Sequence, residues 1–262
     1  MGQAGYNTSM RRFQFSLRSI LLVTTLVAIV CGIGAYIYRQ NRLADQRGAT
    51  LADMRRIMSG MQFYDENSHR PLTPTVDDAQ GRPLSSWRWT VIWCVGQTDF
   101  VEVPSDPLWS SPNNAEWRKS RVGLCFSEAN ANNPRAYDTN IFAITGPGTA
   151  FDPTLNVPHS LNRLAKDPAV SDTILVVEVR NSKTHWMQPG DFDIRTMPKT
   201  IDDPAGEGIS GNCPGCFCVG FVDLTVMMLR NDTPFDKLAL FFTIESARQH
   251  DRDAVLGPFQ VK

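Results

Sequence analysis

The feature that most constrains this chain is an uncharged apolar stretch at residues 20–38, which reads ILLVTTLVAIVCGIGAYIY. A helix of this length rises about 28 Å at 1.5 Å per residue, close to the ~30 Å thickness of a bilayer's hydrocarbon core. Other apolar runs, such as residues 173–179, are too short to span it. The stretch therefore predicts a single transmembrane helix whose partner is membrane lipid.

A cleaved secretory signal is the first alternative. Arg11, Arg12 and Arg18 supply a positive leading segment, as a signal would have. However, the apolar run exceeds the roughly 7–15 residues of a signal core, and it has no small-x-small cleavage site. We therefore expect a retained anchor in the cytoplasmic membrane, with the globular domain on the exported side. The charges do not set this orientation, because three more arginines follow the stretch by residue 47.

The charge of the chain is divided between its two parts. Up to residue 60 there are eight arginines against two aspartates, net +6, whereas the remainder has 18 basic and 25 acidic residues, net −7. A basic segment beside an anchor suits anionic headgroups, and an acidic domain repels nucleic acid. We expect no nucleic-acid binding.

A helical pattern continues beyond the anchor. Apolar side chains recur at spacings of three and four, at Leu51, Met54, Met58 and Met61. This pattern predicts an amphipathic extension over residues 39–68 that packs on its own domain. Gly48 and Gly60 each weaken the helix by about 1 kcal/mol relative to Ala and are candidate kinks.

From residue 69 to 262 the pattern changes to short β-rich runs separated by turn-forming residues. Predicted strands lie at residues 87–95, 140–145, 173–179 and 217–229. The last run is long enough for a hairpin, which we expect to turn at Asp223 and Leu224. Thr233 as N-cap and Pro234 as first residue predict a helix reaching about Gln249.

The predicted organisation is a basic segment (1–19), a transmembrane helix (20–38), its helical extension (39–68) and one globular domain (69–262). The fold class is α+β, with an irregular, mainly antiparallel sheet and a C-terminal helix. This is the plan of a pilin or pseudopilin.

Several segments resemble a family of bacterial pilin-like proteins known as a domain of unknown function. Its members carry a prepilin-type N-terminus and a C-terminal motif of His, nine residues, Asp and Gly. The segments that carry the resemblance are residues 81–88, 106–114, 139–140, 145–151, 172–178, 185–191 and 219–223. The resemblance implies a pilin-like fold for most of the chain beyond residue 81.

The chain departs from this family in two places. In the closing motif Cys213 stands where His is expected, with nine residues between it and Asp223, and Leu224 replaces the Gly. A positive φ would cost Leu224 roughly 1–2 kcal/mol, so we expect a wider or different turn. At the N-terminus, Phe15 follows Gln14 instead of the Gly at which pilin precursors are cut, so we expect no processing.

Five cysteines outside the anchor are candidates for a disulfide or a metal site. They are Cys94, Cys125, Cys213, Cys216 and Cys218. A disulfide within residues 213–218, or from there to Cys94 or Cys125, is the favoured interpretation. Redox activity is disfavoured because a β-rich run follows the C-x-x-C, where a helix N-terminus would lower a thiol pKa. We predict no metal, because no second Cys/His pair has zinc spacing.

The remaining candidate site residues do not fit a known sequence motif. Four aspartates, Asp191, Asp193, Asp202 and Asp203, do not fit a calcium loop and are interpreted as solvated. Glu178 ends a predicted strand, where we expect it to cap or to pair with Arg180 or Arg88. Residue types for hydrolysis occur at His159, Ser160, Ser171, Asp172, Glu178 and His185, without a known motif.

The sequence thus predicts a membrane-anchored, pilin-like envelope protein with a structural or binding role. We predict no catalytic residues and no cofactor, and the expected partners are lipid and envelope proteins. The alternative is an anchored metal- or thiol-dependent enzyme built around Cys213, Cys216 and Cys218. A third hypothesis, assembly into a pseudopilus, predicts contacts between copies along the 51–61 stripe.

Overall fold

The structure, a computed structural model, describes residues 17–68, 71–95, 106–119, 137–155, 158–204 and 207–261. The chain divides into two compact units, Met1–Ala44 and Asp45–Lys262. The elements other than the sheet strands are α1 (Leu17–Asn67), α2 (Trp87–Cys94), η1 (Pro112–Asn114), α3 (Ala115–Arg118), α4 (Leu161–Ala165), α5 (Phe235–Ala239), α6 (Ile244–Ala247), α7 (Arg252–Leu256) and η4 (Gly257–Phe259).

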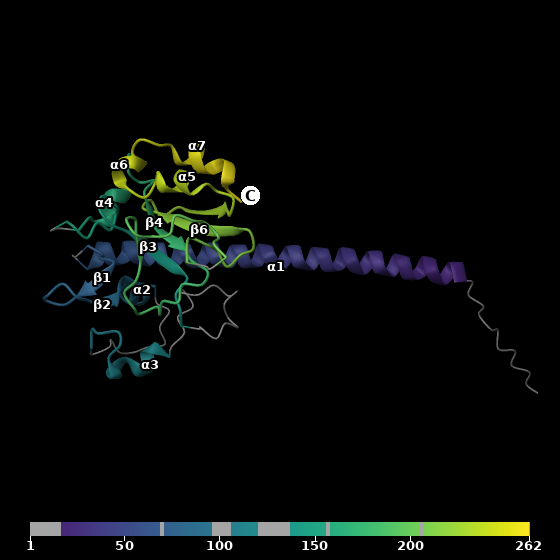
Figure 1. Ribbon diagram of the computed structural model, residues 1–262, viewed down its shortest axis with the longest axis horizontal. Helices are drawn as coiled ribbons and strands as arrows, with labels where there is room; N and C mark the ends of the chain where they lie inside the picture. The colour runs from purple at the N-terminus through teal and green to yellow at the C-terminus, as the bar shows by residue number, and fades with distance from the viewer. Residues whose placement is uncertain are drawn as a thin grey trace, which may run out of the picture. The chain divides into compact units, whose positions relative to one another are not determined.

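Helix α1 joins the predicted transmembrane segment and its extension in one helix (Figure 1). It runs without interruption through Gly48 and Gly60, because an isolated glycine costs only about 1 kcal/mol in a helix. Within the described residues, α1 is the one helix that is long and apolar enough to cross a membrane.

A five-stranded mixed sheet is the centre of the globular unit. Its strands are β3 (Ile141–Thr145), β4 (Ile174–Glu178), β5 (Phe192–Asp193), β6 (Cys216–Phe221) and β7 (Val226–Arg230), in the order β5-β3-β4-β6-β7. All neighbours are antiparallel except β3 and β5, which are parallel. A separate pair, β1 (Thr75–Asp77) and β2 (Pro83–Ser86), is antiparallel. The strands predicted at 140–145 and 173–179 and the hairpin at 217–229 are therefore confirmed.

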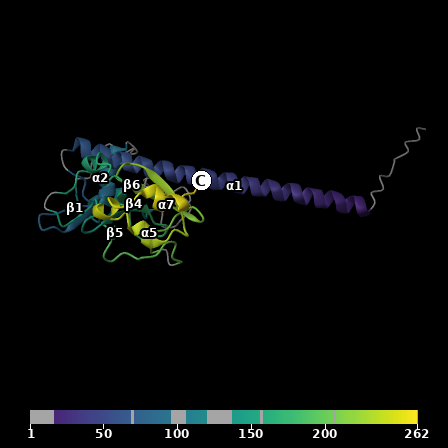
Figure 2. The same ribbon diagram turned by 90° about the horizontal axis from the view of Figure 1, so that it is seen from above.

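Helices cover both faces of the sheet (Figures 1 and 2). The part of α1 after residue 45 and α2 share one apolar cluster with one face, whereas α5, α6 and α7 pack on the other. A register shift in β4 between Ile174 and Val176 places the neighbours Leu175 and Val176 in the same cluster. The sheet is therefore buried on both sides.

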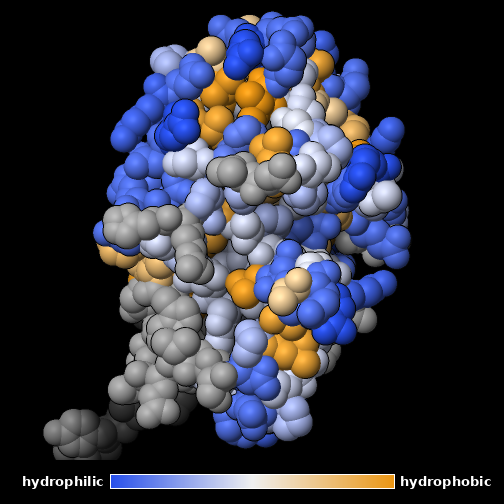
Figure 3. Space-filling model, turned by 90° about the vertical axis from the view of Figure 1, so that its left-hand side faces the viewer, coloured by the Kyte–Doolittle hydropathy of each residue, from blue (hydrophilic) through white to orange (hydrophobic). Residues whose placement is uncertain are grey.

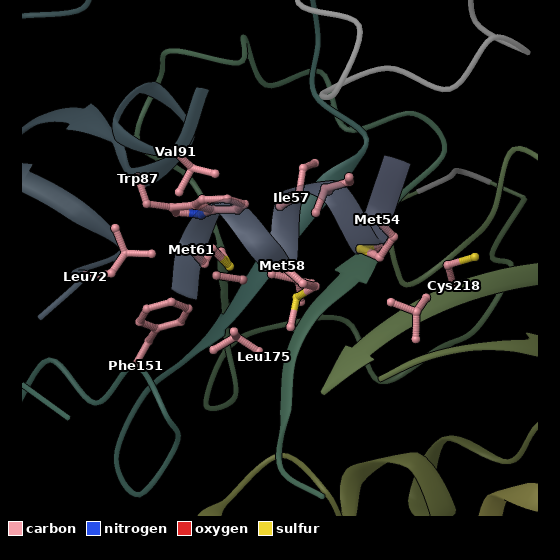
Figure 4. Packing of buried hydrophobic residues seen from close by; sticks show 14 of the residues in the cluster. Met54, Ile57, Met58, Met61, Leu72, Trp87, Val91, Phe151, Leu175 and Cys218 are labelled. Carbon is pink, nitrogen blue, oxygen red and sulfur yellow. The ribbon is translucent and has the colours of Figure 1, made fainter. Parts of the chain in front are cut away.

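The predicted stripe of α1 packs on its own domain. Met54, Met58 and Met61 are almost completely buried, and Figure 4 shows them beside Leu175 and Cys218 of the sheet. Gly220 of β6 allows the close approach, because a Cβ there would lie 2.8 Å from the Met58 sulfur. Since the stripe is buried within one chain, contacts between copies along it are not supported.

The prediction of a strand at residues 87–95 is wrong. These residues form α2, capped by Ser86, whose hydroxyl oxygen accepts from the Arg88 amide at 3.2 Å. Trp87 and Val91 are both buried, four residues apart, as one helix face requires. Packing on α1 thus overrides the β preference of the aromatic and β-branched residues.

The prediction of a single late helix is also wrong. Helices α5, α6 and α7 replace it, and the Thr243 and Asp251 side chains cap α6 and α7. The Phe241 carbonyl accepts from the Ile174 amide of β4 at 2.7 Å, so Phe241 hydrogen-bonds to the sheet. Thr233 is not the N-cap of α5, a position that Pro234 takes.

The hairpin between β6 and β7 keeps its tight turn despite the leucine. Leu224 adopts φ +68°, and its amide donates to the Phe221 carbonyl at 2.9 Å. Phe221 also donates to Thr225, which closes a three-residue loop. This loop is one residue longer than the expected turn at Asp223 and Leu224, in agreement with the expectation of a wider or different turn, but Leu224 still adopts the positive φ, at a cost of roughly 1–2 kcal/mol.

Gly60 offers a test of how tightly α1 packs. A Cβ at Gly60 would lie 2.5 Å from a Val95 methyl and 2.9 Å from a Val91 methyl. We expect Gly60→Ala to lower the free energy of unfolding by about 1–2 kcal/mol, because overpacking exceeds the gain in helix propensity. Equilibrium unfolding of the full chain in detergent micelles, followed by tryptophan fluorescence, measures the difference.

Gly48→Ala on the same helix is the matched control. A Cβ at Gly48 meets nothing within 4 Å, so this variant should gain about 0.5–1 kcal/mol from helix propensity alone. Equal gains at both positions would contradict the packing argument.

Candidate functional site

The two halves of the closing motif lie at opposite ends of β6. Cys213 precedes the strand and Asp223 follows it. A six-residue strand spans about 20 Å, so Cys213 and Asp223 are not brought together. The nine-residue spacing therefore reflects the length of a strand and its flanking turns.

At the Asp223 end, charged groups hold the hairpin against α7. The Asp223 carboxylate accepts from the Thr225 amide at 2.9 Å and pairs with Arg252 at 3.0 Å. Arg252 also pairs with Asp172 at 3.3 Å, and its guanidinium lies over the Phe221 ring. Burial raises the pKa of Asp172, and Arg252 opposes this rise. These contacts are structural.

At the Cys213 end, the segment Cys213-Pro214-Gly215-Cys216 forms a β-turn. The Cys216 amide donates to the Cys213 carbonyl at 3.3 Å, and Gly215 has φ +77°. Pro at the second position and a positive φ at the third are typical of a type II turn. Within this turn the Cys216 thiol donates to the Cys213 carbonyl at 3.9 Å, and the two thiols influence each other's pKa.

Glu178, the last residue of β4, lies completely buried beside this turn. Its carboxylate accepts from the amides of Asn212 at 2.9 Å and Cys218 at 3.0 Å. Burial raises the Glu178 pKa from 4.5 to about 7, although these hydrogen bonds favour the ionised form. The carboxylate caps backbone amides, as the sequence suggested.

The arginine partners proposed for Glu178 are engaged elsewhere. Arg180 pairs with Asp202 at 3.2 Å, and Arg88 pairs with Asp191 at 2.7 Å. Of the two roles expected for Glu178, capping is therefore the one that the structure shows.

The two thiols of the turn have opposite electrostatic environments. The Cys213 thiol's hydrogen bond, followed by the Arg47 guanidinium, lowers the Cys216 pKa from 9.0 to about 7, against the effect of burial. The same hydrogen bond and burial raise the pKa of Cys213. As predicted, a strand and not a helix follows the C-x-x-C, and the Cys216 pKa is lowered instead by Cys213 and Arg47.

Sequence reasoning did not select Arg47 as part of the site. A signal was present, because Arg47 lies four residues before Leu51 and so continues the buried stripe of α1. A cation on the face that packs on the sheet indicates a partner there. That the partner is Cys216, 169 residues away, follows only from the fold.

The other cysteines lie apart from the turn or outside the described residues. Cys218 is buried against α1, where burial raises its pKa. Cys94 donates to the Thr90 carbonyl within α2 at 3.7 Å. The described cysteines are free thiols, and Cys125 lies outside the described residues. Nowhere in the described ranges do three or more His, Cys, Asp or Glu side chains form a group that could hold a metal ion.

The interpretation of Asp191 as a solvated loop acid is wrong. Its carboxylate accepts from Arg88 at 2.7 Å, from the Ala143 amide at 2.7 Å and from the Trp87 ring at 3.1 Å. Burial raises the Asp191 pKa, and Arg88 opposes this rise. The pair locks α2 onto the sheet. Asp193, by contrast, is part-exposed and hydrogen-bonded to Arg195, which lowers its pKa to about 2.

The residue types considered for hydrolysis have structural roles. The Ser160 hydroxyl donates to Asp65 at 2.7 Å and caps α4. His185 accepts from the Met187 amide at 3.2 Å and hydrogen-bonds to the Arg118 carbonyl at 3.0 Å. Burial lowers the His185 pKa, so the neutral ring is favoured.

Aromatic rings surround this histidine. His185 stacks on Trp109 and Trp186, and Trp186 stacks on Trp89 at a centroid separation of 5.6 Å. Trp186 is fully buried and Trp109 packs against the main cluster. Trp109 and Trp186 thus belong to the apolar core.

A groove of about 540 Å³ opens beside the cysteine turn. Its lining residues are Arg47, Pro214, Gly215, Arg230, Gly257, Pro258, Gln260 and Val261. Two guanidinium groups face it, and Arg230 is partly neutralised by Asp232 at 2.9 Å. The groove therefore has a cationic wall next to Cys213 and Cys216.

Comparison of the chain with protein families, with curated proteins and with solved structures found no match.

Glu178 predicts a pH dependence of stability. Because its pKa is raised in the folded state, the folded protein holds the proton more tightly than the unfolded chain. Stability should fall as pH rises from about 4.5 to about 7, by roughly 3 kcal/mol, and the Glu178 contribution should level off above that. Chemical unfolding at a series of pH values measures the slope.

Glu178→Gln is the control for this slope, because glutamine has the same shape and does not ionise. The variant should lose most of the fall between pH 4.5 and 7. An unchanged slope would assign the effect to another group, such as Asp191.

Proposed function

We propose that this protein is a single-pass, pilin-like protein of the cytoplasmic membrane with a structural or binding role in the cell envelope. Its globular unit lies on the exported side. The observation that carries the proposal is the exposure of the apolar part of α1. The large apolar side chains from Leu17 to Tyr38 are each about half exposed or more. No residue in the most apolar part of α1 is buried.

Lipid is the solvent that suits these side chains. Burying one Val, Leu or Ile is worth about 1.5–3 kcal/mol, so leaving more than ten of them in water would be very unfavourable. The core helix of a soluble protein would be mostly buried, in contrast to this segment. Figure 3 shows a different surface on the globular unit, where hydrophilic residues separate small apolar groups.

The pilin-like part of the proposal is supported by the order of the elements. A long N-terminal helix has an apolar first half, and its second half packs on a mainly antiparallel sheet. This is the plan that the resemblance implied. The third hypothesis, a pseudopilus assembled through the 51–61 stripe, loses support because Met54 and Met58 are buried within one chain.

A binding or structural role is favoured over catalysis because the candidate catalytic residues already form hydrogen bonds within the fold. Ser160, Glu178 and His185 each hold backbone or side-chain groups of the fold. The metal-dependent form of the alternative enzyme has no ligand group among the described residues. Its thiol-dependent form is supported only by the Cys213–Cys216 pair.

Charge placed in the apolar part of α1 tests the anchor. We expect the double substitution Val27→Arg and Ile29→Arg to move the full-length protein out of the membrane fraction, because each arginine costs about 2.5–3.5 kcal/mol at the centre of a spanning helix. Gln40→Arg, just beyond the stretch, should remain with the membranes. Sedimentation after alkaline carbonate extraction, with immunodetection, measures the partition. Recovery of unaggregated wild-type protein in the soluble fraction would refute the proposal.

Processing of the N-terminus tests the relation to pilins. Because Gln14 occupies the position of the Gly before the cleavage site, we expect the native protein to retain residues 3–14. Intact-mass measurement of protein purified from its own membranes reads this directly. A mature chain beginning at Phe15 would show that it is handled as a pilin precursor. A Gln14→Gly variant provides the comparison, since it restores the residue that the peptidase requires.

A further inference from the structure

We propose that Cys213 and Cys216 form a redox-active dithiol that converts reversibly to a disulfide within the turn by exchange with an external disulfide. The inference goes beyond the proposed envelope role and does not depend on membrane anchoring. It assigns a modification site whose reactant class is a low-molecular-weight or protein disulfide. Cys216 is the attacking thiol and Cys213 the resolving thiol.

The turn geometry allows this bond. Cys213 and Cys216 are the first and fourth residues of a hydrogen-bonded β-turn, which holds their Cα atoms within about 7 Å. Disulfides require Cα separations of about 4.4–6.8 Å. Since the Cys216 sulfur already lies 3.9 Å from the Cys213 carbonyl oxygen, closing the bond needs only a local movement of the turn.

The surroundings of the turn distinguish the two sulfurs. The neighbouring Cys213 thiol and the positive charge of Arg47 both favour the negative charge of a thiolate on Cys216. The Arg47 Nε is buried and has no hydrogen-bond partner. Cys218 is also fully buried, but burial raises the pKa of its thiol. The asymmetry assigns the nucleophile to Cys216.

The groove supplies access. Cys213 is only 3% exposed and Cys216 is fully buried, but Pro214 and Gly215 between them are exposed and line the groove with Arg47. Opening the turn from the groove side would uncover both sulfurs without unfolding β6. The cationic wall suits a disulfide that carries carboxylates.

The exchange has two steps. The Cys216 thiolate attacks one sulfur of the external disulfide, whose S–S bond breaks and releases one thiolate. The Cys213 thiol then loses its proton, and its sulfur attacks the mixed disulfide at Cys216 and expels the second thiol. In sum the turn loses two electrons and two protons, and the external disulfide gains both.

Equilibration of the reduced full-length protein in detergent micelles with mixtures of glutathione and glutathione disulfide tests the proposal. Samples are acid-quenched and alkylated, and the cysteine peptides are mapped by mass spectrometry. We expect Cys213 and Cys216 to lose alkylation together, to appear as one internally linked peptide, and to be restored by reductant. The proposal is wrong if the pair stays reduced in every mixture, or if either cysteine links instead to Cys94, Cys125 or Cys218.

Two pairs of variants sharpen the test. Cys218→Ala should leave the link unchanged, whereas Cys213→Ala should stop the reaction at a glutathione adduct on Cys216. Arg47→Gln should slow modification of Cys216 about three- to tenfold at neutral pH, because the thiolate fraction falls. Arg55→Gln is the matched control. Arg55 lies on the same helix, but its charge acts on Cys218, so this substitution should not slow modification of Cys216. Equal slowing in both arginine variants would contradict the assigned role of Arg47.

Discussion

The packing of the second half of α1 onto β6 is the contact on which the rest of the structure depends. Met58 reaches the sheet because Gly220 has no side chain, and β4 carries a register shift that presents two consecutive residues to the helix. Apolar burial of this kind is worth about 1.5–3 kcal/mol per large side chain. The same part of α1 carries Arg47, so this packing also places a cation beside the cysteine turn.

Buried charge is the second constraint on the fold. Glu178 and the Arg88–Asp191 pair each lie in the interior, and each is held by several hydrogen bonds to the backbone or to rings. Such groups destabilise a core unless their bonds are complete, and they therefore favour one arrangement of the segments that supply those bonds. Arg88–Asp191 determines where α2 sits, and Glu178 determines the path of residues 212–218. The shape of the cysteine turn is a consequence.

The proposed envelope role combines a passive part with a reactive part. In that proposal the apolar segment of α1 is the membrane anchor and takes part in no chemistry. The turn at Cys213 and Cys216, with Arg47 beside it, offers a thiolate next to a second thiol in a groove with a cationic wall. Because the proposed redox pair lies in the turn that leads into β6, its oxidation state can change without disturbing the rest of the sheet.

Local patterns in the sequence determined the elements whose signals are strong. The uncharged stretch predicted the apolar helix, the stripe ending at Met61 predicted its packing, and short β-branched runs predicted β3, β4 and the β6–β7 hairpin. Only the tertiary structure decided the rest. Residues 87–95 became helical because packing on α1 outweighed their β preference, and Phe241 interrupted the late helix because β4 uses its carbonyl. The place of Arg47 in the stripe indicated a partner on the sheet, but that this partner is Cys216, 169 residues away, was decided by the fold.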